Sequence, residues 1–316
     1  MLPKFQNLYK GPLKKVFKTE DSKFIALVGL KVTGISFAIT IFVHWFIFEI
    51  MRLNFVFFKA HGLPMYFGGE SFFDILIEEA LGNLTSLFLF HIFLFFIGAY
   101  VGWLILRPFR LLGEYAEKVM DNPNAIYQVE QFSTYSLLTR FSEFFFDYLR
   151  ESRKRNELIS HSIPPQYSRI HKPVFDKVFM LHFGILLVII SIASAFFIIE
   201  NASAIYSSMV ELATRTLDNQ KSVSRFFSAQ IFILDDIVAL TISLISLCYI
   251  LLGFHLYAKV SGAAFGIFST MRAFMKGNYS SRVHLLGFAH IREYTRKLNK
   301  YLDHIQNNFT KEHSKK

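Results

Sequence analysis

Residues 84–106 read LTSLFLFHIFLFFIGAYVGWLIL, a run that contains no Asp, Glu, Lys or Arg. About 20 apolar residues of helix suffice to cross the hydrocarbon core of a bilayer. Three further apolar runs of similar length lie at approximately Phe24–Ile50, Val178–Ile199 and Ile231–Tyr257. Continuous apolar runs favour helices over the alternating strands of a membrane barrel. The sequence therefore predicts an all-α polytopic membrane protein with four transmembrane helices, the second at Leu84–Leu106.

The distribution of Lys and Arg predicts the orientation of these spans. Residues 1–23, 107–177 and 258–316 hold 6, 11 and 11 of them, whereas the intervening loops 51–83 and 200–230 hold 2 and 3. The positive-inside rule then places both termini and the central segment in the cytoplasm of a bacterial cell, with the spans in its inner membrane. Topology accounts for the net charge of +10, so no nucleic-acid partner is expected.

The order of span, short outer loop, span and cytoplasmic segment occurs twice, which indicates two tandem repeats. The predicted organisation is a basic N-terminal segment, a first helix pair with its loop, a first cytoplasmic segment, a second helix pair with its loop, and a second cytoplasmic segment with the tail. Their boundaries are 1–23, 24–106, 107–172, 173–257 and 258–316.

Both cytoplasmic segments begin with an apolar seam that continues the preceding span. Spacings of three and four residues are typical of the a and d positions of a short coiled coil. The seam residues are Phe109, Leu112, Ala116 and Val119 in the first segment, and Ala264, Ile267, Met271 and Phe274 in the second. After turn-rich connectors a second seam follows, at Leu137, Phe141, Phe144 and Tyr148, and at Ile291, Tyr294, Leu298, Tyr301 and Ile305.

The order of span, helix, glycine-containing connector and helix resembles the HAMP linker of bacterial sensor kinases, chemoreceptors and membrane cyclases. Met-Lys-Gly-Asn-Tyr-Ser-Ser-Arg-Val at 275–283 is similar to the family's connector A-x-G-D-L-x-x-R-V, and Leu298-Asn299-Lys300 falls where the family has F-N-R. Two departures are Ala289-His290 in place of an acidic pair, and Ala263 in place of a proline. The first copy has that proline at Pro108.

The resemblance implies a parallel four-helix bundle made by two chains, and therefore a homodimer whose seams pack across a two-fold axis. It also implies that the bundle relays movement of the membrane helices to an output domain, which a separate cytoplasmic protein would have to supply. The alternative is that the amphipathic helices pack on each other within one monomer. Residues 157–165 also resemble the stretch that precedes class III cyclase domains, although Pro164-Pro165 equally reads as a helix stop.

Each span contains one histidine, and these form two depth-matched pairs: His44 with His91, and His182 with His255. Such pairs are what bis-imidazole haem ligation requires, and equally what interhelical hydrogen bonds or snorkelling produce. We predict structural roles, with no cofactor and no metal site. The single cysteine, Cys248, excludes an intrachain disulfide, and the absence of any catalytic motif predicts a protein that is not an enzyme.

Other polar and small residues in the spans are assigned to packing and anchoring. Lys31 is expected to snorkel to the headgroups, and Asp235-Asp236 to form a polar collar rather than a cation or proton site. Glycines four apart let helix backbones approach closely in lipid. Two such pairs are Gly98 with Gly102, and Gly262 with Gly266.

These observations favour a non-enzymatic signal-relay or scaffold protein, bound to the lipid bilayer and to a cytoplasmic partner. A channel, transporter or ion-driven motor subunit is a second hypothesis, because flagellar stator proteins share the topology. A small b-type membrane cytochrome is a third, resting on the four histidines.

Overall fold

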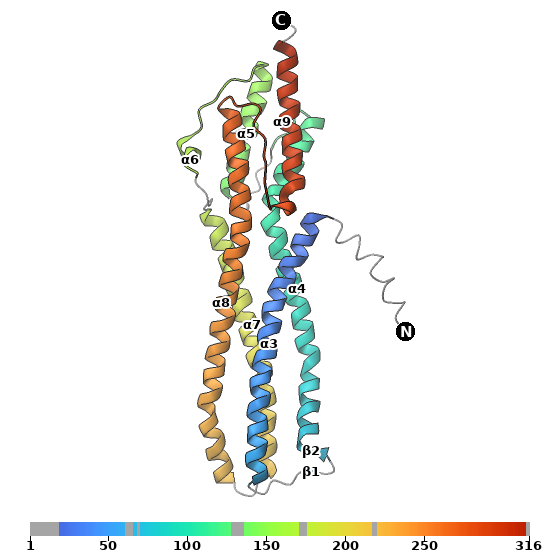
Figure 1. Ribbon diagram of the computed structural model, residues 1–316, viewed down its shortest axis with the longest axis vertical. Coiled ribbons are helices and arrows are strands. Elements are labelled where there is room, and N and C mark those ends of the chain that lie inside the picture. The colour runs from blue at the N-terminus through green and yellow to red at the C-terminus, as the bar shows by residue number, and fades with distance from the viewer. Residues whose placement is uncertain are drawn as a thin grey trace, which may run out of the picture. The chain divides into compact units, whose positions relative to one another are not determined.

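The computed structural model describes residues 19–60, 66–67, 70–127, 136–170, 176–216 and 220–313. The regular structure of these residues is all-helical apart from one pairing of two-residue strands, β1 (Tyr66–Phe67) with β2 (Glu70–Ser71). Within these residues four helices are long and apolar enough to cross a membrane, as the prediction of a multi-pass membrane protein requires. They are α3 (Glu20–Ala60), α4 (Phe72–Asp121), α7 (Lys177–Thr216) and α8 (Gln220–Met275) (Figure 1).

Shorter helices follow α4 and α8 along the chain. After α4 come α5 (Ser136–Arg155) and the single turn α6 (Pro165–Ser168). After α8 come the 3₁₀ turn η1 (Ala289–Ile291) and α9 (Arg292–His313). The order of long helix pair and following helix is therefore the same in both halves of the chain.

The long helices extend well beyond the apolar runs that identified them. The 56 residues of α8 correspond to about 84 Å at 1.5 Å per residue, whereas a hydrocarbon core is about 30 Å thick. Helix α4 likewise continues without interruption through Pro108 to Asp121. The helices therefore run directly from apolar into polar sequence, as the seams that follow the spans predicted.

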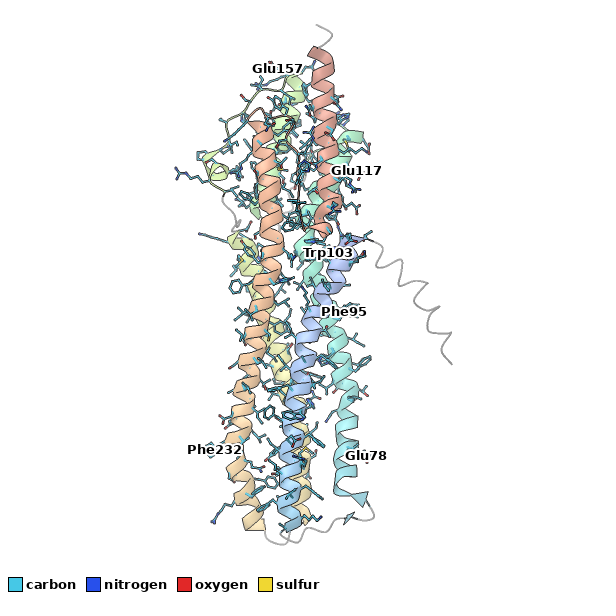
Figure 2. The ribbon with its side chains drawn as sticks, viewed as in Figure 1. Glu78, Phe95, Trp103, Glu117, Glu157 and Phe232 are labelled. Atoms are coloured by element: carbon cyan, nitrogen blue, oxygen red, sulfur yellow. The ribbon has the colours of Figure 1, made fainter. Side chains whose placement is uncertain are left out.

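The apolar sections of these helices expose large hydrophobic side chains outward. Trp45 on α3, Phe96 on α4 and Phe196 on α7 are between half and two thirds exposed, and Phe232 on α8 is 75% exposed (Figure 2). In water such a surface would drive aggregation, but in lipid it costs nothing because the tails are equally apolar. This distribution supports a bilayer as the surrounding medium.

The chain divides into two compact units, and each unit takes residues from both halves of the sequence. One comprises the start of α3 up to Val28, the segment Ala99–Gly184 and the segment from Gly253 onward; the other comprises Gly29–Gly98 and Ile185–Leu252. Each long helix contributes one section to each unit, and the tandem domains expected from the sequence stay a prediction.

In the unit of Gly29–Gly98 and Ile185–Leu252, the helices are joined by close backbone approach and by buried polar groups. A Cβ atom on Gly98 would lie 2.8 Å from Val32 Cβ of α3, so only glycine allows this approach of α4. The Tyr249 hydroxyl of α8 donates to the Val32 carbonyl at 3.1 Å. Asn54 of α3 donates to Gln230 of α8 at 2.9 Å. Interhelical hydrogen bonds of this kind specify helix pairing in an apolar medium.

In the other unit, the end of α4, α5, the end of α8 and α9 form a four-helix bundle. The aromatic rings of Phe141 and Phe145 on α5 pack on Phe268 and Phe274 of α8, with ring centroids 5.1 and 6.1 Å apart. Since both pairs ascend in sequence together, α5 and α8 run parallel. We refer to this assembly (residues 107–121, 136–155, 258–275 and 292–313) as the four-helix bundle.

The remaining contacts show that α9 and α4 run in the same direction. The Cβ position of Gly113 on α4 lies 2.9 Å from Tyr294 Cα of α9, and Glu117 pairs with Lys297 at 2.8 Å (Figure 2 labels Glu117). Tyr115 of α4 packs edge-on against Phe146 of α5 at 4.6 Å, and farther along both segments Arg153 donates to the Pro123 carbonyl at 3.0 Å. Since these contacts also ascend together, α5 runs with α4 and the bundle is a parallel one.

Candidate functional site at the start of the four-helix bundle

The predicted seam residues on α4, on α8 and in η1 and α9 form the core of the four-helix bundle. Those named here are each at most 5% exposed within the single chain. They are Phe109, Leu112, Ala116 and Val119 on α4, Ala264, Ile267, Met271 and Phe274 on α8, and Ile291, Leu298 and Ile305 in η1 and α9. One chain therefore brings together side chains that the resemblance assigned to an interface between two chains.

Of the second seam after α4, only part faces the core. Phe141 is fully buried, but Phe145 is buried as completely and was absent from the predicted seam. Phe144 instead lines a hollow on the bundle surface. Between Phe141 and Tyr148 the seam can pass through Phe144, with spacings of three and four residues, or through Phe145, with spacings of four and three. The sequence pattern allows both, and α5 is rotated so that Phe145 faces the core.

One side chain of α9 holds the connector between α8 and α9 to the bundle, through hydrogen bonds to the connector's backbone. Asn299 accepts from the Val283 N–H at 2.8 Å and donates to the Val283 carbonyl at 2.9 Å. Arg282 reaches Asp303 at 2.7 Å and Gln306 at 2.6 Å. Gly277 starts the connector at a φ of +98°, a backbone conformation that favours glycine.

The two predicted glycine pairs have different neighbours. Gly98 and Gly102 of α4 lie against the backbone and Cβ atoms of α3, at Gly29, Val32 and Val28. Gly262 and Gly266 of α8 instead make room for the connector side chains Phe288 and Leu285, whose carbons lie 2.9 and 2.5 Å from the added Cβ positions. The second pair therefore does not bring helix backbones together, and seats the connector instead.

A polar cluster joins the start of α3 to the bundle. The Tyr294 hydroxyl of α9 donates to Asp21 Oδ2 at 2.7 Å. Arg110 of α4 lies 3.4 Å from the same carboxylate oxygen and donates to the Tyr294 hydroxyl at 3.3 Å. Burial and the bond to Asp21 raise the pKa of Tyr294 to about 12, so the phenol keeps its proton at neutral pH. We call Asp21, Arg110 and Tyr294 the junction cluster.

An aromatic stack makes a second contact between the same elements. Phe24 of α3 and His290 of η1 lie face to face, with ring centroids 4.3 Å apart and an interplanar angle of 13°. Burial, together with the nearby Lys259 ammonium, lowers the pKa of His290 to about 4. The imidazole is therefore neutral at pH 7 and contributes an apolar surface at a position where the resembling family carries an acid.

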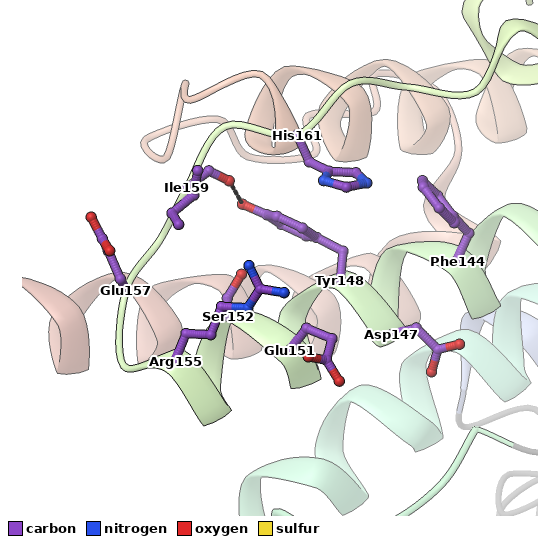
Figure 3. A pocket seen from close by; sticks show the side chains of 9 residues that line it. All are labelled: Phe144, Asp147, Tyr148, Glu151, Ser152, Arg155, Glu157, Ile159 and His161. Atoms are coloured by element: carbon purple, nitrogen blue, oxygen red, sulfur yellow. Dashed lines mark hydrogen bonds between the residues drawn. The ribbon is translucent and has the colours of Figure 1, made fainter.

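The segment after α5 passes along the far end of α8. Its His161 N–H donates to the Met275 carbonyl at 2.8 Å, and Tyr279 donates to the Leu158 carbonyl at 2.9 Å. Tyr148 of α5 donates to the Ile159 carbonyl at 3.1 Å (Figure 3). The stretch that resembled a cyclase linker is thus fixed across the end of the bundle in this chain.

These residues border a hollow with a volume of about 260 Å³ on the bundle surface (Figure 3). The rings of Phe144, Tyr148 and His161 form one side, and Figure 3 shows Asp147 and Glu151 on α5 below these rings and Glu157 farther off, beyond Ile159. The carboxylates are those of Asp147, Glu151 and Glu157, and Arg155 is also present. Aromatic faces beside carboxylates are suited to a guanidinium or ammonium group.

Of the four histidines in the spans, two line one cavity and two have exposed side chains. His44 of α3 and His91 of α4 line the same cavity. His182 of α7 and His255 of α8 both have exposed side chains. Among the described residues, no group of three His, Cys, Asp or Glu side chains is placed to hold a metal ion.

The other predicted polar positions lie on the surfaces of their helices or partly within them. Asp235 and Asp236 of α8 are exposed, and Lys31 of α3 and Cys248 of α8 are half-buried. The basic segment 1–18 lies outside the described residues, as does the stretch 128–135 between α4 and α5.

Comparison with known proteins adds no assignment. No family model matches the chain, and neither a curated protein nor a solved structure is significantly similar to it.

Proposed function

We propose that this protein is a non-enzymatic signal-relay or scaffold protein of a bacterial inner membrane, with both termini in the cytoplasm. In this proposal the apolar helices receive a stimulus and the four-helix bundle passes it to a separate cytoplasmic protein. The observation that carries the proposal is the junction cluster. It links the first turn of α3 to α4 and α9, so a displacement of α3 pulls directly on the bundle.

The geometry of the bundle supports a HAMP-like mode of action. Its four helices run parallel, and its second connector begins at a glycine with positive φ and is held by Asn299. In the resembling family two chains each supply one helix pair. We propose that the two pairs of this chain take those places, giving a bundle that one chain completes.

A homodimer, which the resemblance also implied, would then have to use another surface. The seam residues on which that expectation rested are buried within the single chain. Packing a second copy on them would require the bundle to open first.

The output partner is proposed to approach the bundle surface beside α5. The hollow lined by Phe144, Tyr148 and His161 is bordered by carboxylates, so a partner that presents an arginine or lysine side chain would fit it chemically. Two of these carboxylates already pair with neighbours one turn away, Asp147 with Arg150 at 2.7 Å and Glu151 with Lys154 at 3.1 Å. These exposed pairs are weak and can be exchanged for a partner's cation.

The relay can be tested by changing the thickness of the surrounding bilayer. A span responds to hydrophobic mismatch by tilting, and a relay must carry that change to α9. Purified protein would be placed in bilayers of short and long acyl chains, and amide hydrogen exchange followed in residues 292–302. We expect exchange in α9 to differ between the bilayers, and Tyr294→Phe to reduce that difference.

The matched control is Tyr301→Phe, which removes a buried hydroxyl from the same helix but leaves the junction cluster intact. Identical α9 exchange in all bilayers, in a protein whose α3 exchange does respond, would overturn the relay.

A further inference from the structure

We infer that the cavity between α3 and α4 that contains His44 and His91 is a binding site for a lipophilic phenol. The cavity lies entirely within one compact unit and has a volume of about 600 Å³, in the range of small-molecule sites. It is mainly apolar, with Phe37 and Ile41 from α3 and Leu87 and Phe88 from α4, and it opens outward because Phe37, Ile41 and Phe88 are each more than half exposed. Its polar groups are few, as is typical of sites that fix the orientation of an apolar ligand.

The orientation of both imidazoles is fixed by their own helices. His44 Nδ1 lies 2.8 Å from the Thr40 carbonyl, and His91 Nδ1 lies 2.7 Å from the Leu87 carbonyl. A carbonyl only accepts, so each Nδ1 carries the hydrogen. In a neutral imidazole the Nε2 is then an acceptor with a free lone pair.

Among His44, His91 and Thr40, the only hydrogen available to the two Nε2 atoms is that of the Thr40 hydroxyl. His44 Nε2 is buried and has no hydrogen-bond partner among the described residues. His91, which is 8% exposed, has its Nε2 3.4 Å from Thr40 Oγ1, whose hydroxyl also donates to the Ser36 carbonyl at 2.9 Å. The one hydroxyl hydrogen of Thr40 is thus shared between two acceptors, the Ser36 carbonyl and His91 Nε2, and His44 Nε2 is left without a donor.

The missing group is an O–H or N–H at the head of an apolar molecule. A buried acceptor without a donor costs about 1–3 kcal/mol, which a ligand hydroxyl would recover. The aromatic walls favour a phenol over an aliphatic alcohol, since Phe37 already packs edge-on against His91 with ring centroids 5.5 Å apart. The phenol ring would lie between Phe37 and Phe88, with its hydroxyl donating to His44 Nε2. This site does not depend on the relay proposed above.

The test uses a long-chain alkylphenol that carries a photoreactive diazirine, and its methyl ether as a matched probe without a donor. The purified protein would be irradiated with each probe in lipid nanodiscs, and the labelled peptides identified by mass spectrometry. We expect the phenol to label segments 37–44 and 84–91 with competition by unlabelled alkylphenol, and the ether to label them about five- to tenfold less, the effect of one hydrogen bond.

Three variants separate recognition from folding. His44→Leu should lower phenol labelling to the level of the ether, whereas His44→Gln, which keeps an acceptor oxygen, should restore part of it. His182→Leu is the matched control, because His182 also bonds its own helix through Nδ1, to Val178 at 2.8 Å, but lies outside the cavity. Equal labelling by phenol and ether would mean that the cavity takes any apolar chain, and would overturn the inference. Absence of labelling by both probes would overturn it as well.

Discussion

At the scale of single residues, Tyr294 is the side chain on which the connection between α3 and α9 depends most. Its hydroxyl donates to the Asp21 carboxylate and accepts from Arg110. Hydrogen bonds to charged groups contribute about 1.5–3 kcal/mol. We expect Tyr294→Phe to lower the free energy of unfolding, measured by denaturant titration in detergent micelles, by about that amount.

Tyr301→Phe provides the comparison at a matched buried tyrosine. Its hydroxyl has a 3.4 Å contact with Arg153, which is long for a strong hydrogen bond. The loss of stability should therefore be smaller than for Tyr294→Phe. Equal losses in the two variants would show that the junction cluster contributes nothing beyond an ordinary buried hydroxyl.

The lowered pKa of His290 leads us to expect that the stability of the protein depends on pH. The pKa of His290 is about 4 in the folded protein, against 6.5 when unfolded, so the unfolded chain binds the proton more tightly. The stability contributed by neutral His290 is present above pH 6.5 and is lost as pH falls towards 4. The melting temperature should therefore fall between pH 7 and 5, and His290→Phe, which keeps a ring against Phe24, should flatten that fall. An unchanged slope in His290→Phe would exclude His290 as its cause.

Some contacts between single residues could not be predicted from the sequence. Asp21 and Tyr294 are 273 positions apart, and neither lies in a motif that signals a pairing. Tyr294 was predicted only as an apolar seam residue, and its hydroxyl gives it a second role. The convergence of His44 and His91 was foreseen from their matched depth, whereas the exposure of His182 and His255 depends on helix rotation, which depth does not determine.

At the scale of elements, the second connector should be the most sensitive to one substitution on α9. Asn299 both donates to and accepts from the Val283 backbone. Asn299→Ala leaves both backbone groups without a partner, and we expect a loss of about 1–3 kcal/mol in unfolding free energy. Amide exchange at Val283 should accelerate.

The control for this change is Asn308→Ala, on the same helix. Asn308 is exposed, and its side chain hydrogen-bonds His304, one turn away, at 3.0 Å. Its replacement should change stability by less than about 0.5 kcal/mol. A similar cost in the two variants would mean that Asn299 does not hold the connector.

Packing of α3 on α4 gives a second prediction at this scale. Gly98→Ala would place a methyl group 2.8 Å from Val32 Cβ, and overpacking of this kind costs about 1–3 kcal/mol. Gly34→Ala on α3 has no atom within 4 Å of the added methyl and should be neutral or slightly stabilising. Unfolding titrations of both variants measure the difference, and a neutral Gly98→Ala would contradict the close approach.

The elements themselves were largely predictable from the sequence. Uninterrupted apolar runs gave the four spans, and seam periodicity gave the helices that follow them. The ends of the helices were less predictable, since α3 continues ten residues beyond Ile50 to Ala60. Hydropathy marks only the lipid-facing section of such a helix, and nothing in that pattern stops the helix where the apolar run ends.

At the scale of the whole molecule, the decisive question is whether one chain or two chains supply the four helices of the bundle. A seam shows that a helix face must be buried, but a periodic pattern does not identify what buries it. The sequence therefore left a two-chain bundle and a one-chain bundle open. Phe109 and Phe274 come from the two halves of one chain and are both fully buried in it.

The central claim, that one chain completes the parallel bundle, is tested most directly by a cysteine pair. In a Cys248→Ser background, Glu117→Cys on α4 and Lys297→Cys on α9 replace two long side chains whose charged ends lie 2.8 Å apart. Since the two thiols are then separated by the length of the lost side chains, a short bismaleimide is used to link them in place of oxidation. Two copies with different epitope tags would be expressed together, treated with the bismaleimide in native membranes and separated. We predict a cross-link within each chain, seen as a linked 117–297 peptide at monomer mass. Cross-linked species carrying both tags would contradict the account, because two chains would then share one bundle.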